Sequence, residues 1–144
     1  MSLLHENRRI WQKHVLAENR RSVDGLLETL CHAPVYTIMA TGEEYRGKAA
    51  VAEFYTGLFA GVPDATFDLI SAFVSEDGVM EESMLKGTQR GELFGLPPTN
   101  KSFSLPLIIV FPIKNGEILG ERLYFDLATL MHQLGIPLDQ ISVM

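Results

Sequence analysis

The first third of the chain carries hydrophobic residues at the spacing of amphipathic helices. Such residues recur at i, i+3, i+4 and i+7, which places them on one helix face. The pattern predicts a helix up to about residue 17, a second helix that begins at the N-cap residue Ser22 and runs to Leu30, and a third over residues 48–59. Residues 33–39 are rich in β-branched side chains and predict a short strand between the second and third helices.

From residue 66 onward the apolar spacing changes to two, as in strands with one buried face. Residues 66–76 and 79–88 flank Asp77-Gly78, and residues 103–113 and 118–125 flank Asn115-Gly116. Both dipeptides favour the tight turn of a β-hairpin. We therefore expect a meander of four long antiparallel strands.

A last helix is predicted over residues 127–134. Asp126 stands at its N-cap position, Gly135 follows its last turn and Pro137 lies beyond. Helices that precede a meander without alternating with its strands are typical of the α+β class. The predicted fold is a curved antiparallel sheet with three N-terminal helices on one face and a short C-terminal helix.

The composition is that of one globular domain, with 144 residues, 47% hydrophobic and 21% charged. We expect this domain to span residues 1–144, with residues 1–3 a vector-derived start. No apolar run approaches the roughly 20 residues of a membrane span, so no membrane partner is expected. Cys31 is the single cysteine and cannot form an intramolecular disulfide, which makes a reducing cytoplasm the expected location.

The charge pattern argues against nucleic acid as a partner. The net charge is −6, and the only basic run, around Arg8-Arg9, fits a solvated helix face. His5, His32 and His132 share no metal-ligand spacing with one another. No βαβ pattern surrounds the glycines near residue 91, as a dinucleotide site requires. We predict no metal and no cofactor.

Three stretches resemble one known family. GTQRGELFGLPPTNKSF, residues 87–103, resembles the Gly-Thr-His-x-Gly…Gly-x-Pro-Pro-Thr-Gly-Lys segment of the SnoaL-like polyketide cyclase family, within the nuclear transport factor 2-like superfamily. YFDLATLMHQLG, residues 124–135, is similar to that family's closing strand and helix, and EEYRGKAAVAEFYTGLF, residues 43–59, resembles its third helix. Together the resemblance covers residues 11–135.

The resemblance implies a cone-shaped α+β barrel with an apolar pocket at one end, and a homodimer packed through the outer sheet face. The residues of the third long strand agree with this. Leu107 and Ile109 are apolar on one face, and Ile108 and Val110 are apolar on the other. A strand that is apolar on both faces needs cover on both, here from the helices and from a second subunit.

The resemblance also implies an aspartate on the last strand and a histidine on the preceding strand as acid and base. In alignment their positions hold Leu123 and Ile109, neither of which can transfer a proton. Two further departures lie in the loop, where Gln89 replaces the histidine of Gly-Thr-His and Asn100 replaces a glycine.

Strand alternation makes Glu121 the acid nearest to the lost aspartate. If Leu123 faces the pocket, Leu119, Glu121 and Phe125 face it too. A carboxyl group desolvated in an apolar cone suits a general acid or base near neutral pH. The alternative is that Glu121 pairs with a cation such as Arg46 or Arg90, or lies at the wet rim of the cone.

Glu82 is the second catalytic candidate, because alternation places it on the same face as Met80 and Met84, whereas Glu81 is expected to be solvated. Asp126 is the third candidate. It matches the family motif, but its N-cap position explains it without catalysis.

The predicted pocket lining combines residues from the helices and the sheet. Trp11 and His14 on the first helix and Tyr36 on the short strand are expected near the mouth of the cone. The alternative for His14 is a core histidine whose ring nitrogens are both hydrogen-bonded. The other predicted lining residues are Ile109, Leu123 and Phe125.

Two functions remain open from the sequence. The first is a pocket protein that binds a small, mostly apolar, polyketide-like molecule and catalyses cofactor-free aldol cyclisation, isomerisation or dehydration, with Glu121 or Glu82 as base. The second is a non-catalytic ligand-binding or assembly module. Leu123 and Ile109 favour the second, and the two glutamates favour the first.

Overall fold

A computed structural model describes residues 2–140. In chain order the elements are α1 (Leu3–Asn19), α2 (Val23–Leu27), β1 (Leu30–Ile38), β2 (Glu43–Arg46), α3 (Lys48–Gly61), β3 (Thr66–Ser75), β4 (Gly78–Thr88), β5 (Ser102–Lys114), β6 (Glu117–Tyr124), α4 (Leu127–Leu134) and the short 3-10 helix η1 (Leu138–Gln140). The predicted domain also takes in residues 1 and 141–144, which lie outside the described part. Ser2, assigned to a vector-derived start, caps α1 by accepting a hydrogen bond from the backbone N–H of His5.

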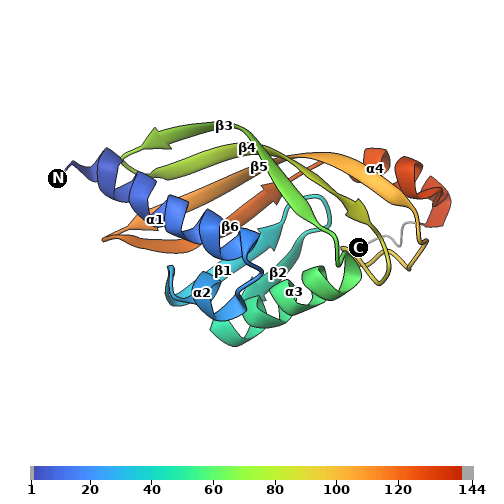
Figure 1. Cartoon of the computed structure of the whole chain (residues 1–144), viewed down its shortest axis with the longest axis horizontal. Helices are drawn as coiled ribbons and strands as arrows, with labels where there is room; N and C mark the ends of the chain where they lie inside the picture. Colours follow the sequence, from blue (N-terminus) through green and yellow to red (C-terminus); the bar gives the residue numbers. More distant parts are fainter. Residues whose placement is uncertain (1, 141–144) are drawn as a thin grey trace.

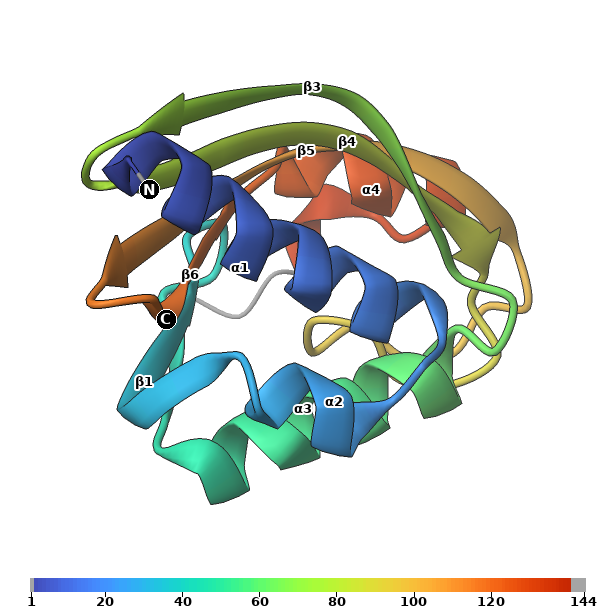
Figure 2. The ribbon, with the colours of Figure 1, turned by 60° about the vertical axis from the view of Figure 1, so that its left-hand side comes forward.

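The described strands form one curved sheet in the order β2-β1-β6-β5-β4-β3. Only β1 and β6 run parallel among these neighbours, and the other pairs are antiparallel. The sheet arches over α1, and α2 and α3 lie on the side that the arch leaves open (Figure 2). α4 lies at the opposite end of the molecule from the N-terminus and packs against β5 (Figure 1). The predicted α+β fold, with helices inside a curved meander, is confirmed.

The second predicted helix is shorter than expected. α2 ends at Leu27, and the strand begins at Leu30, which the helical spacing had placed in the helix. The carbonyl of Thr29 accepts the N–H of Ile118 from β6, so the chain leaves the helix to enter the sheet. Pairing with a neighbouring strand therefore overrides a local apolar spacing that fits either element.

A β-bulge at Gly120 changes the alternation along β6. The register with β5 shifts between Val110 and Ile113, and Gly120 adopts φ +152°. A Cβ on Gly120 would lie 1.9 Å from the carbonyl oxygen of Val35, so only glycine fits. Ile118 and Glu121 both face inward as a result, and the prediction that Leu119 faces the interior is wrong, since it is 37% exposed.

The C-terminal helix follows its predicted capping pattern. The side chain of Asp126 accepts the backbone N–H of Thr129, and Gly135 ends the helix in the left-handed conformation. Leu130, Met131 and Leu134 form its buried stripe. None of the helices within residues 2–140 is long and apolar enough to cross a membrane.

Candidate active site

One face of α1 carries polar side chains into the interior of the cone. Trp11, His14 and Glu18 stand at i, i+3 and i+7, so they share one helix face, and all three are buried under the sheet. Trp11 and His14 hydrogen-bond to buried carboxyl groups of the sheet, and Glu18 adds a third buried carboxyl group on the same helix face.

His14 and Glu121 form the centre of this cluster. The imidazole Nε2 of His14 lies 2.9 Å from Oε2 of Glu121, and the side chains are 0% and 2% exposed. The hydroxyl of Thr29 donates to the carbonyl of Leu26 at 2.7 Å, so it accepts from Nδ1 of His14, also at 2.7 Å. His14 therefore carries a hydrogen on Nδ1, and its Nε2 shares one proton with Glu121.

Two tyrosines extend the hydrogen bonds from Glu121. The hydroxyl of Tyr55 on α3 donates to Oε2 of Glu121 at 2.7 Å, and the hydroxyl of Tyr36 on β1 lies 2.5 Å from that of Tyr55. Burial, and next the negative charge of Glu121, raise the pKa of both phenols well above their ordinary value. Both hydroxyls therefore stay protonated and act as donors, in a chain from Tyr36 through Tyr55 to Glu121.

Glu81 is the second buried carboxyl, contrary to the sequence prediction. Trp11 Nε1 and the Ser83 hydroxyl donate to its two oxygens at 3.0 and 2.9 Å, and burial raises its pKa. Glu82 lies on the outer face of the sheet, half-buried, where it accepts the hydroxyl of Ser71. The methionines beside Glu82 suggested the inner face, but the outer face of β4 is apolar as well.

Glu18 is the third buried carboxyl. Burial, then the charge of Glu121, then that of Glu81, raise its pKa well above the ordinary 4.5. The described part of the chain thus buries three carboxyl groups beside one imidazole and two phenols, with no lysine or arginine among them. Burial without a lysine or arginine nearby favours the protonated form of Glu18 and Glu81, which is the form that can donate a proton.

The two positions where the family resemblance implies acid and base are apolar neighbours. Ile109 and Leu123 pair across β5 and β6 and are 1% and 4% exposed. Glu121 faces the same interior, one inward position along β6 from Leu123, and Tyr36 pairs with Glu121 across β1 and β6. Neither expected alternative partner of Glu121 reaches it, since Arg46 pairs with Glu44 at 2.6 Å and Arg90 donates to the side chain of Asn100.

Two predicted site residues lie away from this cluster. Phe125 is half-buried, with its ring 4.7 Å from that of Phe94. Asp126 is exposed and serves as the cap of α4. The structure therefore brings Trp11, His14, Tyr36 and Glu121 into one cluster.

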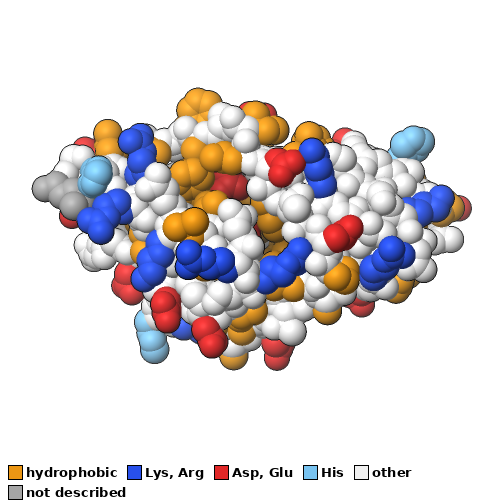
Figure 3. All heavy atoms as spheres, in the orientation of Figure 1, with side chains coloured by type: hydrophobic (Ala, Val, Ile, Leu, Met, Phe, Trp, Pro, Cys, Tyr) orange, Lys and Arg blue, Asp and Glu red, His pale blue; other side chains and the backbone are white. Residues whose placement is uncertain are grey.

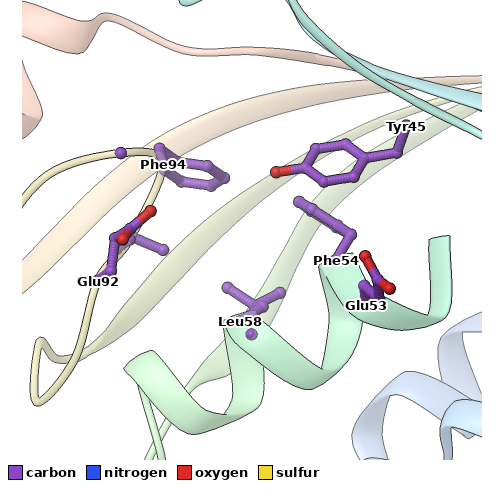
Figure 4. Close-up of a pocket in the computed structure, with 9 residues that line it drawn as sticks. Tyr45, Glu53, Phe54, Leu58, Glu92 and Phe94 are labelled. Carbon is purple, nitrogen blue, oxygen red and sulfur yellow. The ribbon is translucent and has the colours of Figure 1, made fainter. Parts of the chain in front are cut away.

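A small pocket opens near one end of α3. It has a volume of about 120 Å³ and is bounded by α3, by Tyr45 of β2 and by the loop around residues 92–95. In Figure 4 the rings of Tyr45 and Phe94 lie across it, Phe54 and Leu58 rise from α3, and Glu53 and Glu92 flank it. The ring of Phe54 packs against both Tyr36 and Tyr55, so aromatic side chains stand between this pocket and Glu121.

The loop between β4 and β5 is held by Gln89, which replaces the histidine expected from the resemblance. Its side-chain amide donates to the carbonyls of Leu96 and Pro97, and its carbonyl oxygen accepts the hydroxyl of Thr99. Asn100 adopts φ +60°, a conformation that favours the glycine it replaces and that asparagine tolerates. Gln89 therefore has a structural role.

Sequence reasoning missed Glu18, Glu81 and Tyr55. The sequence did carry a signal for Glu18. Its spacing from Trp11 and His14 places this charged residue on the same face of α1 as the apolar residues. Within residues 2–140 no three His, Cys, Asp or Glu side chains are grouped so that they could hold a metal ion.

A curved sheet closed by helices around a buried histidine–glutamate pair defines a cone-shaped α+β protein with acid–base groups inside. The chain belongs to the SnoaL-like polyketide cyclase family, whose model matches residues 7–134. Solved structures agree with this fold. A candidate SnoaL-like polyketide cyclase from Jannaschia sp. CCS1 has a TM-score of 0.82 at 20% identity, over 92% of this chain and 94% of that one.

Two other solved structures have similar folds. A candidate polyketide cyclase from Xanthomonas campestris pv. campestris has a TM-score of 0.80 at 21% identity, covering 92% of this chain and 99% of that one. AclR, a candidate hydroxylase from Streptomyces galilaeus, has a TM-score of 0.76 at 21% identity, covering 93% and 99%. At these identities the likeness concerns the fold alone.

Proposed function

We propose that this protein is a cofactor-free acid–base enzyme that acts on a small, mostly apolar, polyketide-like carbonyl compound. The observation that carries the proposal is the 2.9 Å contact between His14 Nε2 and Glu121 Oε2, both buried, with the Tyr55 hydroxyl on the same carboxylate oxygen. A purely structural core does not need an ionisable pair at its centre, because burial of such groups is costly.

The chemistry follows from the positions of the protons. Thr29 fixes the hydrogen of His14 on Nδ1, so Nε2 is the nitrogen that exchanges a proton with Glu121. Glu121 accepts a proton from the carbon next to a substrate carbonyl, and the electron pair of that C–H bond moves toward the carbonyl oxygen. The Nε2 of His14 can donate a hydrogen bond to the ionised Glu121 or accept one from the protonated Glu121. The same groups deliver the proton to the new alkoxide in ring closure, to another carbon in isomerisation, or to the departing hydroxide in loss of water.

Names of related structures leave the reaction open. The Jannaschia and Xanthomonas proteins are candidate cyclases, and the Streptomyces galilaeus protein is a candidate hydroxylase, so more than one activity is ascribed to this fold. The proposal therefore rests on the site of this chain.

A non-catalytic ligand-binding module is the second candidate. Ile109 and Leu123 favour it, because they form a buried apolar pair at the positions where the resemblance implies a histidine and an aspartate. In this case His14 and Glu121 only stabilise the interior.

Solvent deuterium exchange separates the two candidates. The rate of deuterium incorporation next to the carbonyl is measured by NMR on a panel of cyclic ketones, β-diketones and enones. Glu121→Gln should lower the rate by about 10²–10⁴-fold, the usual contribution of a positioned base. Glu82→Gln is the matched control on the outer face and should stay within about twofold of wild type. No exchange with wild type would rule out this activity, and a full rate in Glu121→Gln would rule out Glu121 as the base.

We also propose that two copies pack through the outer sheet face. Phe73, Met80, Val110 and Arg122 form a cross-strand ladder over β3 to β6 around a groove of about 340 Å³. A second groove of about 550 Å³ on the same face ends at Tyr124, Phe125 and Asp126. A second copy packed against this face would cover the exposed apolar side chains of the ladder.

A further inference from the structure

A separate pocket opens where α1 ends. It has a volume of about 350 Å³ and is lined by residues of α1, α3 and the start of β3, namely Glu18, Asn19, Phe59, Ala65, Thr66, Phe67 and Asp68. Figure 3 shows the face of the molecule that carries α1 and β3, where hydrophobic side chains border a hollow. The volume lies at the lower end of the range for small-molecule sites, about 300–1,000 Å³.

Glu18 is the unexplained group in this pocket. It is 7% exposed, and its carboxyl group makes no hydrogen bond or ion pair with any residue that the structure describes. Glu81 and Glu121, in contrast, each accept two side-chain contacts. No fully buried side-chain oxygen in the described part of the chain lacks a partner, so the oxygens of Glu18 reach the pocket, where a ligand can form a hydrogen bond with them.

The pocket adjoins the centre of the polar cluster. Glu18 follows His14 by four residues on α1, which corresponds to about 6 Å along the helix axis and to the same helix face. After burial, the negative charge of Glu121 is the next cause that raises the pKa of Glu18. A molecule that contacts Glu18 therefore lies next to the His14–Glu121 pair.

The surroundings of Glu18 favour an uncharged ligand. Asp68 at the rim pairs with Lys86 at 2.9 Å, and the guanidinium of Arg21 lies 5.5 Å from the centre of the Phe59 ring. The two charged residues at the rim therefore already have partners. Asp68 is paired with Lys86, and Arg21 lies over the ring of Phe59. Glu18 as a neutral acid offers one O–H donor, and the rings of Phe59 and Phe67 offer apolar contact.

We infer that this pocket is a ligand site and that the Glu18 carboxyl group donates a hydrogen bond to the oxygen of a small, uncharged, ring-shaped carbonyl compound. The inference deepens the proposed function, because such a compound enters beside the proposed base. The pocket near Phe94 is smaller, about 120 Å³ against about 350 Å³, and aromatic rings separate it from Glu121.

Binding is tested without turnover. Cyclohexanone is titrated into the ¹⁵N-labelled full chain, and amide chemical shifts are followed at Asn19, Thr66 and Phe67. Glu18→Gln keeps an N–H donor and should bind within about threefold of wild type, whereas Glu18→Leu should weaken binding about 3–10-fold. Glu53→Gln, an exposed acid at the smaller pocket, is the matched control and should bind as wild type.

Three outcomes would overturn the inference. The first is no saturable shift with cyclohexanone, and the second is unchanged affinity in Glu18→Leu. The third is that cyclohexylammonium, a cation of the same shape, binds more tightly than the ketone. The unchanged amide spectrum of each variant outside the pocket shows that it is folded. Because the readout is binding, failure here leaves the deuterium-exchange test of Glu121 unaffected, and the reverse also holds.

Discussion

His14 on α1 and Glu121 on β6 are 107 residues apart in the chain, yet their side chains meet at 2.9 Å in the interior. The helix and the strand that carry them are packed together by the arch of the sheet. Glu121 also receives the hydroxyl of Tyr55 from α3, so three elements converge on one carboxyl group. Because Tyr55 and Tyr36 lie at different steps from Glu121 in this network, their substitutions should differ in their effect on activity.

Tyr55→Phe should have a larger effect than Tyr36→Phe. The Tyr55 hydroxyl donates directly to Glu121, and a hydrogen bond to a charged group contributes about 1.5–3 kcal/mol. We expect its loss to lower kcat about 10–100-fold if Glu121 is the base. The Tyr36 hydroxyl hydrogen-bonds to that of Tyr55, one step further from Glu121, so Tyr36→Phe should cost about 1 kcal/mol of unfolding free energy and little activity. Steady-state kinetics and denaturant unfolding of both variants measure this. Equal losses in kcat would contradict the ranking.

Much of the architecture was predictable because local signals agree with the fold. The Asn115-Gly116 turn, where both residues have positive φ, and the caps of α4 are examples. Glu121 was predictable as an inward acid for the same reason. Its partner His14 was named only as a pocket-lining or core residue, because the packing of α1 under the sheet is not encoded in any local spacing.

The errors have physical causes that differ from one strand to the next. On β4 both faces are apolar, so alternation separates Glu81 from Glu82 but does not say which faces inward. On β6 the bulge at Gly120 breaks the alternation on which the placement of Leu119 depended. Tyr55 lies on the buried face of α3 among apolar residues, and nothing in the sequence indicates that its hydroxyl reaches a strand.

Glu18 should make stability fall as the pH rises. Its pKa is raised in the folded chain, so the folded state holds the proton more tightly than the unfolded state does. The contribution of Glu18 is therefore fully present below about pH 4.5 and is lost as the pH rises through the folded pKa.

Glu18→Gln removes this loss, so the variant should be more stable than wild type at pH 8 by at least about 1 kcal/mol, and nearly equal to it at pH 4. Thermal unfolding from pH 4 to pH 8 measures the difference. Glu6→Gln, on the exposed first turn of α1, is the control and should not change the slope. A parallel pH dependence in wild type and Glu18→Gln would contradict the assignment.

Asp126→Ala should affect stability and not catalysis. The carboxylate accepts the backbone N–H of Thr129 at the start of α4, and loss of such a cap costs about 1 kcal/mol. Asp126→Asn keeps an acceptor oxygen and should restore most of this stability. Unfolding and deuterium-exchange rates are measured on both variants. If Asp126→Ala loses exchange activity while its stability is unchanged, Asp126 is a catalytic residue and the cap explanation is wrong.

Phe73→Asp should convert the proposed dimer into a monomer. Phe73 is 61% exposed and stands in the ladder with Met80, Val110 and Arg122. A buried charge at this position should raise the dissociation constant by about 30-fold or more, as the loss of an interface hot spot does. Light scattering coupled to size-exclusion chromatography measures the mass. Leu16→Asp, at a 54% exposed position on α1, is the control and should remain dimeric. A monomeric wild type excludes this interface.

Gly120→Ala should disturb both the sheet and the site. The added Cβ would lie 1.9 Å from the carbonyl oxygen of Val35 on β1, and φ of +152° is unfavourable for alanine. Because Glu121 follows directly, relief of the clash moves the carboxyl group away from His14. We expect a loss of more than about 2 kcal/mol in unfolding free energy together with a loss of deuterium-exchange activity.

Gly57→Ala separates this effect from the general cost of replacing glycine. Gly57 lies within α3, and no atom lies within 4 Å of a Cβ built on it, so alanine should stabilise the helix by about 0.5–1 kcal/mol. Denaturant unfolding of the two variants should therefore give changes of opposite sign. If Gly120→Ala is as stable and as active as wild type, the bulge does not position Glu121, and the inward turn of this carboxyl group must come from the helices that pack against it.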